Sequence, residues 1–277
     1  MSDWLSVQQG EEPLIVSFPH TGTFIPEEIE QELISPWLAR KDTDWNIDRL
    51  YDFATELGAT LIRTAVSRTV VDVNRDPLGT SLYPGCATTA LCPTTTFDGE
   101  ALYWEGAEPC AEEIVRRRQL FFDPYHAALN QEIARLRRKH PRIVLYDAHS
   151  IRSIIPRLFG GTLPNFNIGT DNGRTASNEL VRGIEACCDR SKFSHVTNGR
   201  FRGGWTTRHY GEPARGVHAI QMELACRTYM DEPACVASNN WPPAVIHEAR
   251  ADEARALLKD ILVSCANYAR KVSHESL

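Results

Sequence analysis

The chain has 277 residues, of which 42% are hydrophobic, and this is enough to build a large buried core. Its formal net charge of −6 argues against a nucleic-acid partner, which would require a basic face, but allows a small anionic substrate bound in a locally basic pocket. No stretch reaches the roughly 18 apolar residues that a membrane span needs, and the N-terminal residues lack the pattern of a signal peptide, so we expect a cytoplasmic protein without a membrane partner.

In the first part of the chain, short apolar runs alternate with helical spacing. Residues 14–18 form an apolar run closed by Pro19 and predict a buried strand. Residues 47–57 have helical spacing and end at Gly58. Two further strands are predicted at 59–64 and 69–73. Residues 76–110 are rich in Pro, Thr and Gly and predict a long loop or small insertion, either a functional lid or a passive excursion.

The remainder of the chain continues the alternation. We predict helices at 111–122 and 123–140, with Asp123 as the N-cap and Pro124 as the first residue of the second helix. The later predicted elements are a strand at 142–146, a helix at 174–189, a strand at 216–224 and a helix at 248–272. This alternation predicts an α/β fold with a largely parallel or mixed sheet. No Gly/Ser-rich tract or long charge run marks a linker, so we expect a single domain over residues 1–277.

The eight cysteines do not indicate a metal or disulfide site, because no C-x-x-C spacing occurs. Cys226 and Cys265 lie within apolar periodic segments. We therefore expect free, buried thiols.

Polar side chains follow four of the predicted strands. His20 follows 14–18, Asn74 and Arg75 follow 69–73, and Glu223 lies at the end of the last strand, while a fourth group follows 142–146 and comprises Asp147, His149 and Ser150. Ligand sites in open α/β sheets form beyond the carboxyl ends of strands. The pattern therefore predicts that these side chains converge on one site.

Two histidines and a carboxylate can hold Zn²⁺ and leave a fourth position for water. Glu223 then suits the role of a general base, and Arg75 could fix a substrate carboxylate with a forked pair of bonds. The alternatives are structural. Asp147 either orients His149 or caps a turn. Glu223 could be a half-buried ion-pair partner, and Arg75 could form a salt bridge at the surface. Arg208 and His209 lie in a Trp-Thr-Thr-Arg-His-Tyr run bracketed by glycines, which predicts a shaped binding loop or a simple turn.

Five segments together resemble the signature segments of the N-formylglutamate amidohydrolase family, over roughly residues 13–235. The segments are Ser17-Phe-Pro-His-Thr-Gly22, Val71-Asp-Val-Asn-Arg-Asp76, Leu145-Tyr-Asp-Ala-His-Ser150, Arg208-His-Tyr-Gly211 and Ala219-Ile-Gln-Met-Glu-Leu224. The loop at 91–100 resembles the branch of the family that acts in histidine breakdown. The family is in turn similar to zinc carboxypeptidases and aspartoacylase.

The resemblance implies a three-layer α/β/α sandwich and a single divalent metal. Carried over to this sequence, it makes His20 and His149 metal ligands and Glu223 the catalytic glutamate. It also implies that Asn74 and Arg75 grip a substrate carboxylate, and that Arg68 polarises the scissile carbonyl.

The wider carboxypeptidase pattern has a glutamate three residues after the first histidine, where this chain has Thr23. The third ligand must then come from elsewhere. We expect Asp44, with Asp42 as the alternative; either could instead only cap the following helix. Zinc is the ion expected from the ligand type.

The resemblance implies hydrolysis of N-formyl-L-glutamate to formate and L-glutamate, with Arg75, Asn74 and Arg208 holding the small anionic substrate. Two alternatives stay open. One is a metal-dependent aminoacylase or carboxypeptidase acting on another N-acyl amino acid. The other is a non-catalytic carboxylate-binding protein on the same fold, since a fold does not fix a function.

Overall fold

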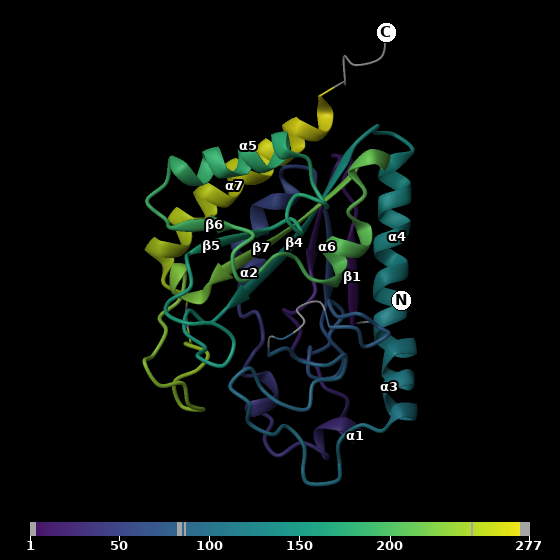
Figure 1. The fold of residues 1–277 in the computed structure, drawn as a ribbon, viewed down its shortest axis with the longest axis vertical. Helices are drawn as coiled ribbons and strands as arrows, with labels where there is room; N and C mark the ends of the chain where they lie inside the picture. Colours follow the sequence, from purple (N-terminus) through teal and green to yellow (C-terminus); the bar gives the residue numbers. More distant parts are fainter. Residues whose placement is uncertain (1–3, 82–84, 86, 245, 272–277) are drawn as a thin grey trace.

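A seven-stranded mixed sheet forms the centre of the computed structural model, which describes residues 4–81, 85, 87–244 and 246–271 (Figure 1). The strand order is β1-β3-β2-β4-β7-β5-β6. The strands are β1 (Leu5–Gln8), β2 (Leu14–Phe18), β3 (Thr60–Thr64), β4 (Ile143–Ile151), β5 (Phe166–Gly169), β6 (His195–Thr197) and β7 (Val217–Ala225). The four central strands are parallel, β1 is antiparallel to β3, and β5 is antiparallel to β7 and parallel to β6. The predicted α/β fold with a mixed, largely parallel sheet is confirmed.

Helices cover both faces of this sheet and complete a three-layer α/β/α sandwich (Figure 1). The α-helices are α1 (Glu27–Glu30), α2 (Ile47–Leu50), α3 (Ala111–Arg117), α4 (Asp123–Arg137), α5 (Asn178–Asp189), α6 (Trp205–Tyr210) and α7 (Glu248–Arg270). The short turns of helix are η1 (Leu38–Arg40), η2 (Asp52–Thr55), η4 (Pro213–Arg215), η5 (Cys226–Thr228) and the π-helix η3 (Arg118–Phe122). One hydrophobic cluster joins the sheet to α2, α5 and α7, and another joins its other face to α4 and α6. Among the described residues, none of these helices is long and apolar enough to cross a membrane.

The alternation of side chains along the central strands explains where polar residues gather. In β4, Val144, Tyr146 and Ala148 pack toward α5 and α7, whereas Ile143 and Leu145 pack toward α4. Because successive side chains point to opposite faces, Asp147 and His149 continue the second row. The same face of β7 carries Val217 and Ala219, and then Gln221 and Glu223. On this face, the apolar core therefore gives way to buried polar side chains toward the carboxyl ends of the strands.

Several predicted boundaries were wrong, because tertiary contacts extend or interrupt the local pattern. The strand predicted to end at Tyr146 continues to Ile151, so Asp147 and His149 lie within β4. The helix predicted over 47–57 is broken into α2 and η2 at Tyr51, whose buried hydroxyl contacts that of Tyr146. Asp123 is not an N-cap, because the π-helix η3 runs directly into α4.

The strand predicted at 69–73 is absent, and strands β1, β5 and β6 were not predicted. The valines at 70, 71 and 73 are buried as expected, but the Asp72 amide between them donates to the carbonyl of Leu91, a loop residue, and not to a neighbouring strand. The backbone turns at 68–70, and the Ser67 hydroxyl accepts a hydrogen bond from the Thr69 amide. Residues 205–210, expected as a binding loop or turn, form helix α6. The 76–110 segment contains only isolated bridges where it is described.

Seven of the eight cysteines lie in the described part of the chain, and all seven are free thiols. Five of them, including Cys226 and Cys265, are buried as expected, but Cys110 and Cys235 are exposed. Cys86 lies outside the described residues.

Candidate metal centre and active site

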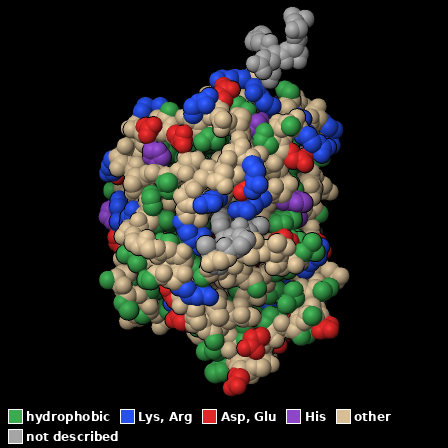
Figure 2. All heavy atoms as spheres, in the orientation of Figure 1, with side chains coloured by type: hydrophobic (Ala, Val, Ile, Leu, Met, Phe, Trp, Pro, Cys, Tyr) green, Lys and Arg blue, Asp and Glu red, His purple; other side chains and the backbone are tan. Residues whose placement is uncertain are grey.

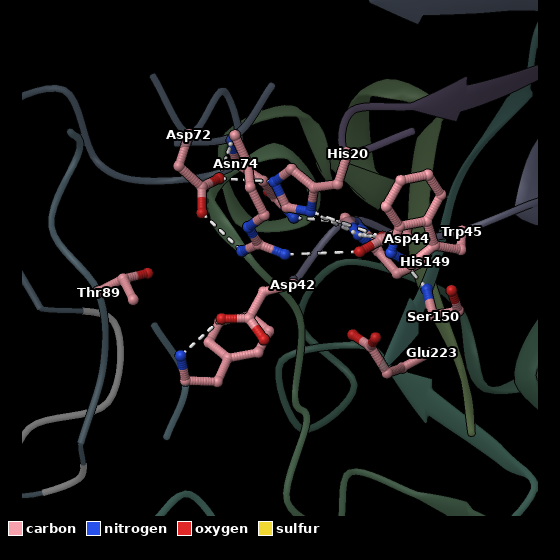
Figure 3. Close-up of polar contacts among 12 residues, drawn as sticks. His20, Asp42, Asp44, Trp45, Asp72, Asn74, Thr89, His149, Ser150 and Glu223 are labelled. Carbon is pink, nitrogen blue, oxygen red and sulfur yellow. Dashed lines mark hydrogen bonds and ion pairs between the residues drawn. The ribbon is translucent and has the colours of Figure 1, made fainter. Parts of the chain in front are cut away.

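Three buried side chains from separate segments converge beyond the centre of the sheet (Figure 3). His20 follows β2, Asp44 lies before α2, and His149 projects from β4. The Nδ1 atom of His149 lies 3.1 Å from both Nδ1 of His20 and Oδ2 of Asp44. The third distance, from Nδ1 of His20 to Oδ2 of Asp44, is 3.6 Å. Ligands about 2 Å from a tetrahedral Zn²⁺ are separated by roughly 3.3 Å, so the spacing of this triad suits a metal ion.

Outer carboxylates fix which nitrogen of each histidine faces the triad. Nε2 of His20 lies 2.6 Å from Asp72, and Nε2 of His149 lies 2.7 Å from Asp147. An N–H directed at each carboxylate leaves the two Nδ1 lone pairs and the Asp44 oxygen converging on one point. Three acceptor atoms at these distances repel one another unless a proton or a cation lies between them. This donor set therefore fits a divalent metal, with Asp72 and Asp147 supporting its ligands.

The pKa values of Asp44 and His149 are shifted by the other charged groups packed around the triad. Burial alone would raise the pKa of Asp44, but its contacts with His149 and His20 lower that pKa. Burial alone would lower the pKa of His149, yet Asp147 beside it raises the pKa well above its usual value. Without a cation, a proton on His149 therefore offsets the surrounding carboxylates. A bound metal ion would take over that role and displace the proton.

Asp42, the alternative third ligand in our sequence analysis, points elsewhere (Figure 3). Its carboxylate accepts hydrogen bonds from the Phe97 amide, at 2.6 Å, and from Arg152, at 3.1 Å. Burial raises the pKa of Asp42 in spite of Arg152. Asp44 instead has one oxygen in the triad, where the Ser150 amide also donates to it. Of the two aspartates, only Asp44 lies where it could bind the metal.

Glu223 is a buried carboxylate next to the triad, opposite His149 in the β4–β7 register. Gln221, two residues earlier on the same strand face, donates a hydrogen bond of 3.0 Å to Oε2 of Glu223. The Gly204 amide in turn donates to Oε1 of Gln221 at 2.6 Å, which orients the Gln221 amide. Burial raises the pKa of Glu223 to about 8, and a cation in the triad would lower it again. This environment suits a group that accepts and returns a proton.

A cavity opens beside Glu223 and the two histidines, and three arginines line it: Arg68, Arg75 and Arg200. Arg68 contacts Asp72 at 2.7 Å and lies 3.5 Å from Asp44, with its guanidinium stacked on the Phe97 ring. Arg68 thus borders both the cavity and the triad.

Asn74 and Arg75 also line the cavity, although the predicted strand before them is absent. The Asn74 amide donates to Asp147, lies 3.0 Å from Nε2 of His149 and accepts a hydrogen bond from the Thr206 amide. Its visible role is to hold the His149–Asp147 pair. Arg75 donates to the carbonyl and the hydroxyl of Thr89 and lies 3.6 Å from Asp72, which fixes it at the cavity wall.

Arg208 and His209 are not among the described residues that line the cavity. Arg208 donates to the Gly203 carbonyl and lies 3.6 Å from Asp171, while the His209 ring stacks on Trp205. Gln221 and Arg200 were not predicted from the sequence as site residues. Gln221 could have been recognised, because it precedes Glu223 by two residues and so lies on the same strand face. No local signal distinguished Arg200.

Gly204 is expected to tolerate no side chain, because it packs directly against Asn74. A Cβ at Gly204 would lie 2.4 Å from Nδ2 of Asn74, whose amide is already held by Asp147 and Thr206. We therefore expect Gly204→Ala to destabilise the fold by about 1–3 kcal/mol and to weaken metal binding. Thermal unfolding and metal titration test this, with Gly160→Ala as the control because a Cβ there has no neighbour within 4 Å. A Gly204→Ala variant that matched the parent in both would contradict the expected clash.

Comparison with known proteins matches the sequence of this chain to one family. The family model for N-formylglutamate amidohydrolase matches residues 12–230. Two curated relatives, both named N-formylglutamate deformylase, are similar over nearly their whole length. The protein from Pseudomonas aeruginosa is 44% identical and aligns over 98% of this chain and 99% of its own. The one from Pseudomonas putida is 43% identical and aligns over 95% of each chain.

Two solved structures share the fold of this chain. The N-formylglutamate amidohydrolase from Ralstonia eutropha superposes with a TM-score of 0.78 at 22% identity, covering 96% of this chain and 98% of its own. The gene product Atu2144 of Agrobacterium tumefaciens superposes with a TM-score of 0.70 at 16% identity, covering 96% of each chain. Given the family model and the curated relatives, the chain belongs to the N-formylglutamate amidohydrolase family.

Proposed function

We propose that this protein is a metal-dependent deformylase that hydrolyses N-formyl-L-glutamate to formate and L-glutamate. The observation that carries the proposal is the convergence of three acceptor atoms beside a buried glutamate, in a cavity lined by arginines. The names of the two curated relatives support the substrate. The likeness of the 91–100 loop to one branch of the family favours a place in histidine breakdown.

The metal in this proposal is a single divalent ion held by His20, Asp44 and His149. Two imidazoles and a carboxylate form a ligand set typical of catalytic zinc, although other divalent ions could serve. When bound, the ion would polarise the formyl carbonyl and acidify water. The protein's part is to hold each Nε2 atom against Asp72 or Asp147, so that both Nδ1 atoms face the position of the ion.

Glu223 performs the proton transfers. It takes a proton from the water that attacks the formyl carbon and passes it to the departing amine nitrogen, so that the C–N bond breaks to give formate and glutamate. Gln221 holds the Glu223 carboxylate during this exchange. Arg68, which borders the cavity between Asp72 and Phe97, stabilises the charge that develops on the formyl oxygen.

A substrate with two carboxylates requires cationic contacts in spite of the net charge of −6. Figure 2 shows Lys and Arg side chains gathered near the middle of one face, so the negative charge is not spread evenly. Within the cavity, Arg75 binds the α-carboxylate, because its contacts with Thr89 hold it near the metal triad. Asn74 keeps His149 in place rather than contacting the substrate.

Formate release from a panel of N-acyl amino acids tests the proposal. We expect N-formylglutamate to be the best substrate, ahead of N-acetylglutamate and N-formylalanine, and a chelator to abolish turnover until a divalent metal is restored. A better N-acetyl or peptide substrate would favour an aminoacylase or carboxypeptidase instead. Binding without turnover of any substrate in the metal-loaded protein would favour a non-catalytic carboxylate-binding protein.

A further inference from the structure

Arg200 is the lining arginine that the mechanism above does not use. It follows β6 and approaches the cavity from the edge of the sheet beyond β7, whereas Arg68 and Arg75 lie on the side of the metal triad. Arg68 lies directly against the carboxylates of Asp72 and Asp44. The cavity therefore has cationic groups on two different walls.

Backbone groups and an aromatic ring orient the Arg200 side chain. Nε of Arg200 donates to the Leu158 carbonyl at 2.7 Å, and one terminal nitrogen donates to the Ala87 carbonyl at 3.4 Å. The guanidinium carbon lies 5.3 Å from the centre of the Phe201 ring. These carbonyl groups fix the direction of the guanidinium. Leu158, Ala87 and Phe201 also line the cavity and give this wall an apolar surface.

One short segment connects Arg200 to Arg75. Ala87 accepts from Arg200, and Thr89 accepts from Arg75 through both its carbonyl and its hydroxyl. Two residues of chain span at most about 7 Å, so the two guanidinium groups are anchored close together along the cavity. That spacing is of the order needed by two carboxylates joined by a short aliphatic chain. Ala87, Leu158 and Phe201, which line the cavity beside Arg200, offer an apolar surface for the methylene groups of such a chain.

We infer that Arg200 binds the side-chain carboxylate of the substrate and makes the cavity selective for N-formyl dicarboxylic amino acids with the chain length of glutamate. The inference rests on the proposed deformylase activity. Arg200 then makes a substrate contact of the kind that the sequence predicted for Arg208. Arg75 binds the α-carboxylate, which is nearer the scissile bond, and Arg200 binds the carboxylate farther from the metal.

The test compares N-formylglutamate with N-formylglutamine, which has the same length but a neutral side-chain amide. Values of kcat/KM are measured for the metal-loaded parent, Arg200→Gln, Arg200→Lys and Arg208→Gln. Arg215→Gln is the control, because Arg215 is an exposed arginine just before the amino end of β7. Metal content is measured for every variant.

We expect Arg200→Gln to lower kcat/KM for N-formylglutamate by about 10- to 100-fold, the usual effect of losing a charge-assisted contact, and to change the value for N-formylglutamine by no more than a few-fold. Arg200→Lys should retain part of the preference for the charged substrate, since it keeps the charge but loses the planar fork. Arg208→Gln and Arg215→Gln should keep the parent's preference for N-formylglutamate over N-formylglutamine. Their metal content should equal that of the parent.

Equal losses on both substrates in Arg200→Gln would overturn the inference, as would an unchanged preference. If Arg208→Gln instead lowered kcat/KM for N-formylglutamate alone, the contact with the substrate's side-chain carboxylate would belong to Arg208. These outcomes differ from failure of the proposed function, which would appear as no formate release from N-formylglutamate by the metal-loaded parent.

Discussion

Replacing Glu223 by glutamine should lower kcat by about 10²- to 10⁴-fold, the usual effect of removing a general acid–base group. Glutamine keeps the shape of the side chain and can still pair with Gln221, so metal content and thermal stability should stay close to those of the parent. The amide can neither accept a proton from water nor return it to the amine. The loss should therefore appear in kcat rather than in KM.

The control for this experiment is Glu132→Gln. Glu132 is also a buried glutamate, but it lies on α4, where Gln9 and Arg135 contact its carboxylate, and it does not line the cavity. Its substitution should change kcat by no more than a few-fold. If Glu223→Gln retained kcat to the same extent, Glu223 would be a structural residue and the proposed proton transfers would be wrong.

Much of the candidate site could be predicted because it lies on strands with a regular pattern. In β4 and β7 the residues of one face change from apolar to polar toward the carboxyl end. Asp147, His149 and Glu223 are therefore conspicuous in the sequence alone. His20 is equally visible, because it directly follows the buried strand β2. Parallel pairing of these strands then brings the four side chains together.

The other parts of the site depend on contacts between segments that are distant in the sequence. The 198–204 segment reaches the cavity only because β5 and β6 pair at the far edge of the sheet, and neither strand was predicted. Arg200 therefore had no local signal, whereas Arg208 belongs to a conspicuous polar run that forms the helix α6. The run at 70–73 also shows the effect of distant contacts. Its valines are buried, but the Asp72 amide pairs with the loop residue Leu91 and not with a strand.

The choice between Asp42 and Asp44 also lay beyond the sequence, because the two are separated by a single residue and carry the same functional group. The backbone separates them. The Asp44 amide donates to the His20 carbonyl, which places its carboxylate beside both histidines. Asp42 instead joins the Phe97 amide and Arg152, and so connects the loop at 95–101 to the end of β4.

This difference gives a matched pair of substitutions, Asp44→Asn and Asp42→Asn. Each is nearly isosteric, and the replaced side chain is 1% exposed for Asp44 and 12% exposed for Asp42. We expect Asp44→Asn to weaken metal binding by more than the roughly 10- to 100-fold typical of losing a residue that only supports a ligand. Asp42→Asn should bind metal within a few-fold of the parent, because Arg152 retains Asp98 as a partner. Titration against a competing chelator measures both affinities. Metal loss in Asp42→Asn with full retention in Asp44→Asn would assign the third ligand to Asp42.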